Sequence, residues 1–101
     1  MDDLDALRQR YLELTNETLP GLAQQRQFPV RFNHCFQRIV LDNLFGRCWY
    51  EALNREAGAA YKQLSVAQLQ DAIAIAQAIA EQPNGYIQDL NQNSLRWRGK
   101  D

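Results

Sequence analysis

The sequence predicts an all-α protein, a compact bundle of four to five helices around a buried central helix. Three observations lead to this fold class. Residues 34–54 are apolar on nearly every side of a helical projection, and a helix-start pattern at residue 65 opens a second stretch with helical apolar spacing. No segment alternates apolar and polar residues over the length of a strand, since the one short candidate, residues 28–32, contains Pro29.

The length of the chain fits one domain. Its 101 residues can enclose a single core, and 46% of them are apolar, as in ordinary globular proteins. We therefore expect residues 1–101 to form one helical domain, with residues 95–101 as a basic and aromatic tail.

The first helix is predicted over residues 2–17. Acidic residues in its first turn favour the positive end of the helix dipole. Its apolar residues recur at three- and four-residue steps: Leu4, Leu7, Tyr11 and Leu14. Pro20-Gly21 is expected to interrupt this helix, which leaves a short helical piece at 18–26 and a loop at 27–32.

The central helix is predicted from His34 to Asn54, with Asn33 as its N-cap. Because apolar residues surround most of its circumference, we expect it to be the buried centre of the bundle. Gly46 lies inside this range and indicates either a kink or the close approach of a neighbouring helix.

Two further helices follow a loop at residues 56–60. Ser65 and Gln68 form a capping-box pattern, and the helix that they open is expected to run to Glu81, before Pro83-Asn84-Gly85. Its small ridge, Ala72, Ala76 and Ala80, suits helix packing, with a ligand groove as the alternative. A short last helix, Tyr86–Leu95, should dock Ile87 and Leu90.

The charge balance excludes some classes of function. Eleven basic and twelve acidic residues give a net charge of −1, which argues against a protein that mainly binds nucleic acid or an anionic membrane. Nine of the basic residues are Arg, the side chain suited to partly buried ion pairs and interfaces.

Targeting and cofactor signals are lacking. The acidic start does not resemble a signal peptide and no apolar run is long enough for a membrane span, so we expect a cytoplasmic protein with no membrane association. Cys35 and Cys48 are expected to be free and buried, and one His with two Cys does not make a metal site. No glycine-rich phosphate loop is present, so we expect no cofactor.

The clearest candidate site is a polar stripe on the central helix. His34, Arg38 and Asp42 lie four residues apart, and Trp49 continues the same face. An imidazole, a guanidinium and a carboxylate so placed could bind an anion or transfer a proton. The alternative is the edge where the buried helix meets solvent, with His34 simply exposed. In either case Arg38 and Asp42 are expected to be partly buried and paired with each other.

The tail is a second candidate. It combines cations with an indole, in Arg96, Trp97, Arg98 and Lys100, and this combination can stack on a base or bind a phosphate. The alternative is a tail that folds back onto the domain, with Trp97 packed and the Arg side chains paired to acidic residues of the helices.

Three segments, residues 32–43, 60–64 and 94–100, resemble a group of short bacterial proteins of uncharacterised function. The similarity covers about residues 30–100. Members of this group sometimes carry an acetyltransferase label, but the common acetyltransferase fold needs a central sheet and a pyrophosphate-binding turn, and this sequence predicts neither. The resemblance implies only that the 34–42 stretch and the tail belong to one recurrent design.

The function that we expect is a non-enzymatic interaction or regulatory module, whose partner is a second copy of the chain, as a homodimer, or another protein. The reason is that the central helix has more apolar perimeter than a small bundle can cover. The alternative is a small enzyme or anionic-ligand-binding protein that uses His34, Arg38 and Asp42. A second alternative is nucleic-acid binding through the tail.

Overall fold

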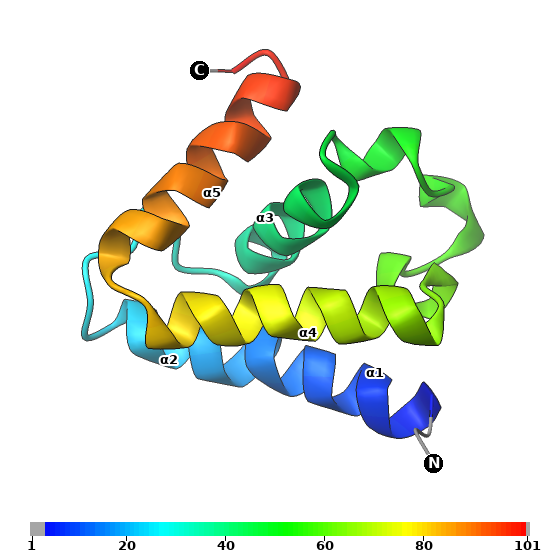
Figure 1. Ribbon diagram of the computed structural model, residues 1–101, viewed down its shortest axis with the longest axis horizontal. Helices are drawn as coiled ribbons and strands as arrows, with labels where there is room; N and C mark the ends of the chain where they lie inside the picture. The colour runs from blue at the N-terminus through cyan, green and yellow to red at the C-terminus, as the bar shows by residue number, and fades with distance from the viewer. Residues whose placement is uncertain (1–3, 101) are drawn as a thin grey trace.

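The chain folds into helices joined by turns and loops, which confirms the predicted all-α class. The α-helices are α1 (Leu4–Glu13), α2 (Leu19–Ala23), α3 (Asn33–Phe45), α4 (Val66–Glu81) and α5 (Asn84–Trp97). Figure 1 shows α1 and α2 in line below α4, with α3 above α4 and α5 rising from the end of α4. Since α1 and α2 form one continuous helical segment, the bundle has four long helical segments in the part of the chain that the structure describes.

The computed structural model describes residues 4–100. Residues 2 and 3 of the predicted first helix, and Asp101 of the tail, lie outside this range. Within it, no helix is both long and apolar enough to cross a lipid bilayer.

Pro20 does not interrupt the first helix, so this prediction was wrong. A π-helical turn, Leu14–Thr18, joins α1 directly to α2. At its end the N–H of Leu19 donates to the carbonyl of Leu14, five residues earlier, so the hydrogen-bond register shifts just before the proline. Pro20 then lies in the first turn of α2, where a missing N–H donor is tolerated.

The central helix is shorter than predicted, because α3 ends at Phe45 instead of Asn54. Gly46 follows it with φ of 69°, a left-handed conformation that favours glycine, and its N–H donates to the carbonyl of Asp42. Gly46 therefore ends the helix and neither kinks it nor admits a neighbour, since an added Cβ would meet nothing within 4 Å. At the other end Phe32 is the N-cap, and Asn33 is already helical.

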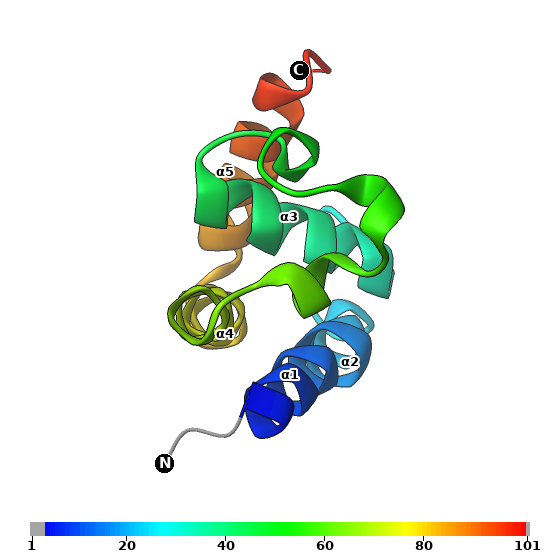
Figure 2. The ribbon, with the colours of Figure 1, turned by 90° about the vertical axis from the view of Figure 1, so that its right-hand side faces the viewer.

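The chain from Gly46 to Ser65 is a connection built from short 3-10 turns. These are Trp49–Glu51, Arg55–Ala57 and Ala60–Gln63. Figure 2, which faces this side of the molecule, shows the connection passing around α3 before it reaches the start of α4. The predicted loop at 56–60 is part of this connection, and its turns place aromatic side chains next to α1 and α3.

The structure confirms the predicted start and end of α4. The Ser65 hydroxyl accepts from the N–H of Gln68, and the Gln68 side chain accepts from the N–H of Ser65, so the capping box is complete. Ala72 and Ala76 are fully buried in the core. Of the two roles weighed for the alanine ridge, the structure shows helix packing.

The last helix is longer than predicted at both ends, since α5 covers Asn84–Trp97. Its Ile87 is fully buried and Leu90 packs against the core, as expected. Residues 95–97, which we assigned to the tail, are the last turn of this helix. The tail proper is therefore shorter, and it begins in contact with the bundle.

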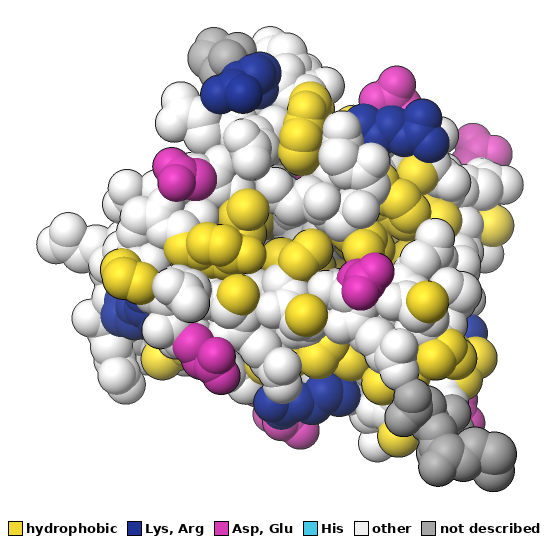
Figure 3. All heavy atoms as spheres, in the orientation of Figure 1, with side chains coloured by type: hydrophobic (Ala, Val, Ile, Leu, Met, Phe, Trp, Pro, Cys, Tyr) yellow, Lys and Arg dark blue, Asp and Glu magenta, His cyan; other side chains and the backbone are white. Residues whose placement is uncertain are grey.

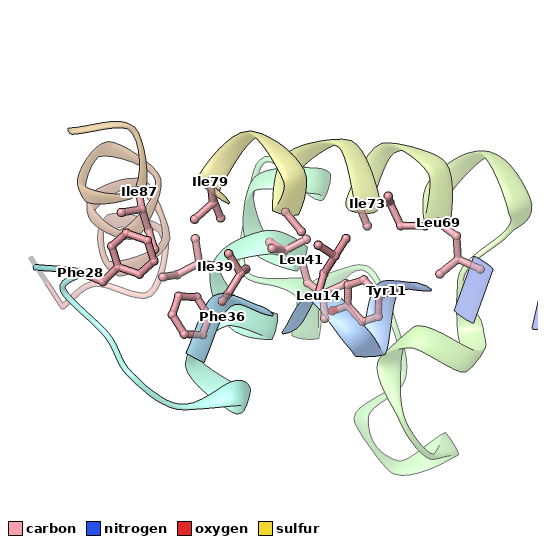
Figure 4. Packing of buried hydrophobic residues seen from close by; sticks show 14 of the residues in the cluster. Tyr11, Leu14, Phe28, Phe36, Ile39, Leu41, Leu69, Ile73, Ile79 and Ile87 are labelled. Atoms are coloured by element: carbon pink, nitrogen blue, oxygen red, sulfur yellow. The ribbon is translucent and has the colours of Figure 1, made fainter. Parts of the chain in front are cut away.

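The core is covered by the chain itself. Figure 4 shows side chains of all the long helical segments, joined by Phe28, meeting around α3. The residues of α3 that form its apolar face are at most 2% exposed: Phe36, Ile39, Val40 and Leu41. The argument for self-association from uncovered apolar perimeter on the central helix was therefore wrong, because the π-helical turn Leu14–Thr18, α2, α4 and α5 all pack around it.

Candidate functional site

Asp42 lies at the centre of a hydrogen-bonded cluster that joins α3 to the end of α5. Its carboxylate is fully buried. Oδ1 accepts from the N–H of Trp49 at 2.9 Å and from Nη2 of Arg98 at 3.1 Å. Oδ2 accepts from the Ser94 hydroxyl at 2.6 Å and from Nε of Arg98 at 2.7 Å. The burial predicted for Asp42 is confirmed, but its ionic partner is Arg98.

Arg38 does not form the predicted pair with Asp42. It donates from Nη1 to the Ser94 hydroxyl and from Nη2 to Oδ1 of Asn91, both at 2.8 Å. It is linked to the carboxylate through Ser94, whose hydroxyl accepts from Arg38 and donates to Oδ2 of Asp42. Both direct partners of Arg38 are neutral, so its positive charge has no carboxylate of its own among residues 4–100.

Arg98 has a second neighbour, the ring of Tyr50. Its guanidinium carbon lies 4.6 Å from the ring centroid, and that of Arg55 lies 3.8 Å from the same centroid. The hydrogen bonds to Asp42 raise the pKa of the Arg98 guanidinium above its ordinary value, despite the opposing effect of burial. Arg98 is thus permanently charged, and it fixes Tyr50 beside α5.

A pocket of about 380 Å³ opens next to this cluster. Its wall includes three of the four predicted ligand-binding residues: His34, Arg38 and Trp49. Asp42 is not part of the wall, and Arg98 from the tail takes its place. The wall therefore holds two guanidiniums and an imidazole, with no carboxylate among its described side chains. We call it the Arg38 pocket.

His34 lies on the exposed side of this pocket. Its ring stacks on Phe32, with the centroids 5.8 Å apart and the planes 4° from parallel. The exposure considered for His34 is confirmed, and the residue also lines the pocket; its role in binding a ligand stays a prediction. It can donate a hydrogen bond to an anion there, or exchange a proton with one.

The remaining wall is largely aromatic and aliphatic. Its members come from four parts of the chain and complete the lining: Tyr11, Gln37, Leu41, Tyr50, Gly58, Ala59, Ala60 and Tyr61. Tyr11 is 1% exposed, and its hydroxyl has no hydrogen-bond partner in the described structure. Burial raises the pKa of this phenol above its ordinary value, so it stays protonated as a donor.

The tail is divided between this pocket and another surface. Arg98 belongs to the cluster, as the folded-back alternative predicted, whereas Trp97 is 37% exposed, so it is only partly packed. Trp97 and Lys100 line a separate hollow with Cys48. Nucleic-acid binding through the tail stays a prediction. Arg98 is not available for it, because its guanidinium is held by Asp42.

The two cysteines are free, as predicted, although only Cys48 is buried and Cys35 is half-buried. Within residues 4–100, no group of three or more His, Cys, Asp or Glu side chains is placed to hold a metal ion. The chemistry that the described site offers is therefore that of arginine, histidine and tyrosine side chains.

Sequence reasoning missed Tyr11, Tyr50 and Tyr61, because a tyrosine with helical or loop spacing looks like any core aromatic. One signal was present, since the segments 32–43, 60–64 and 94–100 that carry the resemblance all contribute to the wall of the Arg38 pocket. Residues far apart in the sequence thus meet at one place. No family model, curated protein or solved structure matches this chain.

Proposed function

We propose that this protein binds a small organic anion, with a carboxylate or phosphate group, in the Arg38 pocket. The observation that carries the proposal is the composition of the wall, where Arg38, Arg98 and His34 face a cavity with no described carboxylate. Concave sites of about 300–1,000 Å³ with mainly apolar walls and a few polar groups are typical of small-molecule sites.

The charges around Arg38 support this proposal. Asp42 is held by Arg98 and is buried behind the wall. Its carboxylate therefore neutralises the guanidinium of Arg98 and leaves that of Arg38 without a counter-charge in the described part of the chain. Arg38 uses two of its five N–H donors, on Ser94 and Asn91, and these bonds fix its orientation. An oriented guanidinium with free donors is well suited to a carboxylate or phosphate.

The experiment is a titration of the ¹⁵N-labelled protein with benzoate and with inorganic phosphate, followed by NMR. We expect at least one of these anions to shift the signals of His34 and of the Trp49 indole. The Arg38→Gln variant should weaken this binding by about tenfold or more, since it removes charge-assisted hydrogen bonds.

The matched control is Arg47→Gln, which removes the same charge from an exposed residue just after α3 that does not line the pocket. It should bind within about twofold of the parent, because an exposed charge is screened by salt. Equal binding by the two variants, or no shift with either anion, would overturn the proposal.

The second candidate function is that of a protein-interaction module that self-associates. We place such a module in the cytoplasm. Figure 3 shows hydrophobic side chains gathered in a band over α4 and between α4 and α5, and such bands can support an interface between copies. Sedimentation equilibrium at micromolar concentration tests this candidate. A dimer is expected, and a strictly monomeric protein would contradict it.

A further inference from the structure

The two guanidiniums in the wall of the Arg38 pocket are not equivalent in charge. Arg98 is bound by both oxygens of the buried Asp42 carboxylate, so this ion pair adds no net charge to the pocket. Among residues 4–100, the side chain of Arg38 bonds to the neutral groups of Ser94 and Asn91. Arg38 therefore supplies the one permanent charge of the described wall that has no counter-charge.

Two further cationic side chains near the pocket are exposed to water. His34 lies on the exposed side of the pocket, with its ring stacked on Phe32. Arg55 contacts the ring of Tyr50, a wall residue, but it is itself exposed and does not line the pocket. Because water and salt screen exposed charges, both contribute less to binding inside the pocket than the half-buried Arg38.

The start of α3, beside His34, does not provide amides for a phosphate. The first N–H groups of a helix are a common site for phosphate groups. Here the N–H of His34 donates to Oδ1 of Asn33. The N–H groups of Cys35 and Phe36 donate to the carbonyl of Phe32. These three donors are thus used within the start of the helix.

The guanidinium of Arg38 is accessible to a ligand. Its bonds to Ser94 and Asn91 come from Nη1 and Nη2, which leaves Nε and one N–H on each Nη atom without a partner among residues 4–100. Nε is not one of the buried unpartnered atoms of the described side chains, so it is open to solvent. Arg38 can therefore donate further hydrogen bonds to an anion.

One uncompensated guanidinium favours a ligand with one negative charge. The attraction between a ligand and a fixed charge grows in proportion to the charge of the ligand. The cost of taking an ion out of water grows with the square of its charge. Apart from Arg38, Arg98 and His34, the described wall is uncharged, so a second negative charge adds more desolvation cost than attraction.

We infer that the ligand of the Arg38 pocket carries a single negative charge, as a monocarboxylate does, and that the pocket discriminates against phosphate monoesters and other dianions. This inference rests on the proposed function and deepens it, since it chooses between the two anion classes named there. Asp42 sets this selectivity from behind the wall, because it neutralises the charge of Arg98.

The test compares benzoate with phenylphosphonate by NMR titration at about pH 8.5. The two probes share a phenyl ring, but at this pH benzoate carries one negative charge and phenylphosphonate two, and an imidazole is ordinarily neutral. We expect the parent to bind benzoate about tenfold more tightly. Benzenesulfonate has the three oxygens of a phosphonate and a single charge. It should bind within about threefold of benzoate, which separates the effect of charge from that of shape.

Two variants test the cause of the selectivity. Asp42→Asn leaves the charge of Arg98 uncompensated, and Gln37→Lys adds a charge to the wall without changing the ion pair. Both should shift the ratio of the two affinities toward phenylphosphonate by about fivefold or more. The control Gln88→Lys adds the same charge to an exposed residue outside the pocket, and it should leave the ratio within about twofold. If Asp42→Asn does not fold, Gln37→Lys decides.

The inference and the proposed function fail in different ways. If an anion binds through Arg38 but the parent binds phenylphosphonate as tightly as benzoate or more tightly, the inference is overturned and the anion site stands. The same holds if Gln37→Lys leaves the ratio unchanged or shifts it no more than Gln88→Lys does. If neither benzoate nor phenylphosphonate nor inorganic phosphate binds through Arg38, the proposed function itself is refuted.

Discussion

The carboxylate of Asp42 on α3 is held by the guanidinium of Arg98, which follows α5 and lies 56 residues later in the chain. The side chain of Asp42 is fully buried and that of Arg98 is 14% exposed. A bidentate pair of this kind fixes the angle between its planar groups as well as their distance. It therefore connects the end of the last helix to the central helix, next to the Arg38 pocket.

We expect Asp42→Asn to lower the free energy of unfolding by about 3–5 kcal/mol, because it leaves the Arg98 charge nearly buried without a counter-charge. Urea denaturation measures this loss. The control is Glu13→Gln, which breaks a pair with Arg10 whose side chains are 44% and 55% exposed. It should cost less than about 1 kcal/mol. Equal losses would mean that the Asp42 pair is no stronger than a surface contact.

A double-mutant cycle should show which arginine is coupled to Asp42. Arg98→Met combined with Asp42→Asn is expected to give a coupling energy of about 1.5–3 kcal/mol, because the two side chains are in direct contact. Arg38→Met with Asp42→Asn should give a smaller value, since Ser94 lies between them. The reverse order would favour the Arg38–Asp42 pair that the sequence predicted.

Stability at high pH should depend on Tyr11. Burial raises the pKa of this phenol above its ordinary value of 10.0 in the folded protein. Above about pH 10 the unfolded chain therefore loses this proton while the folded protein keeps it, and stability decreases as the pH rises. The decrease from this group is at most about 1.4 kcal/mol per pH unit.

Denaturation of the parent and of Tyr11→Phe between pH 8 and 11 measures this effect. The stability of the variant should fall less steeply above about pH 10, with the two curves parallel below it. Curves that stay parallel through the whole range would show that the Tyr11 hydroxyl ionises as readily in the folded protein as in the unfolded chain.

Gly46→Ala should destabilise the protein by about 1 kcal/mol. The cost comes from the backbone, because Gly46 has φ of 69° and an added Cβ would meet nothing within 4 Å. Gly21→Ala is the matched control, since Gly21 lies in α2 without a positive φ and also has open space around it. It should stabilise by about 0.4–1 kcal/mol, because alanine restricts the unfolded chain. Thermal melts of both variants measure these effects. Shifts in melting temperature of the same sign for the two variants would contradict this explanation.

Local patterns predicted the elements that depend on local interactions. The capping box at Ser65 predicted the start of α4, because each of its hydrogen bonds joins residues three apart. Pro20 and Gly46 were interpreted wrongly from the same kind of information. The effect of proline depends on the hydrogen-bond register around it, and glycine ends a helix only when its backbone turns left-handed.

The sequence by itself determined that the fold is all-α, that Asp42 is buried, and that His34, Arg38 and Trp49 share one face, which lines one pocket. Only the tertiary structure decided that Asp42 pairs with Arg98, and that, among residues 4–100, Arg38 has neutral partners and the hydroxyl of Tyr11 has none. The physical reason is the range of the interactions. Helical periodicity indicates which side chains share a face. A buried ion pair or an unsatisfied hydrogen-bond donor depends instead on which distant segments the packing of the helices brings together.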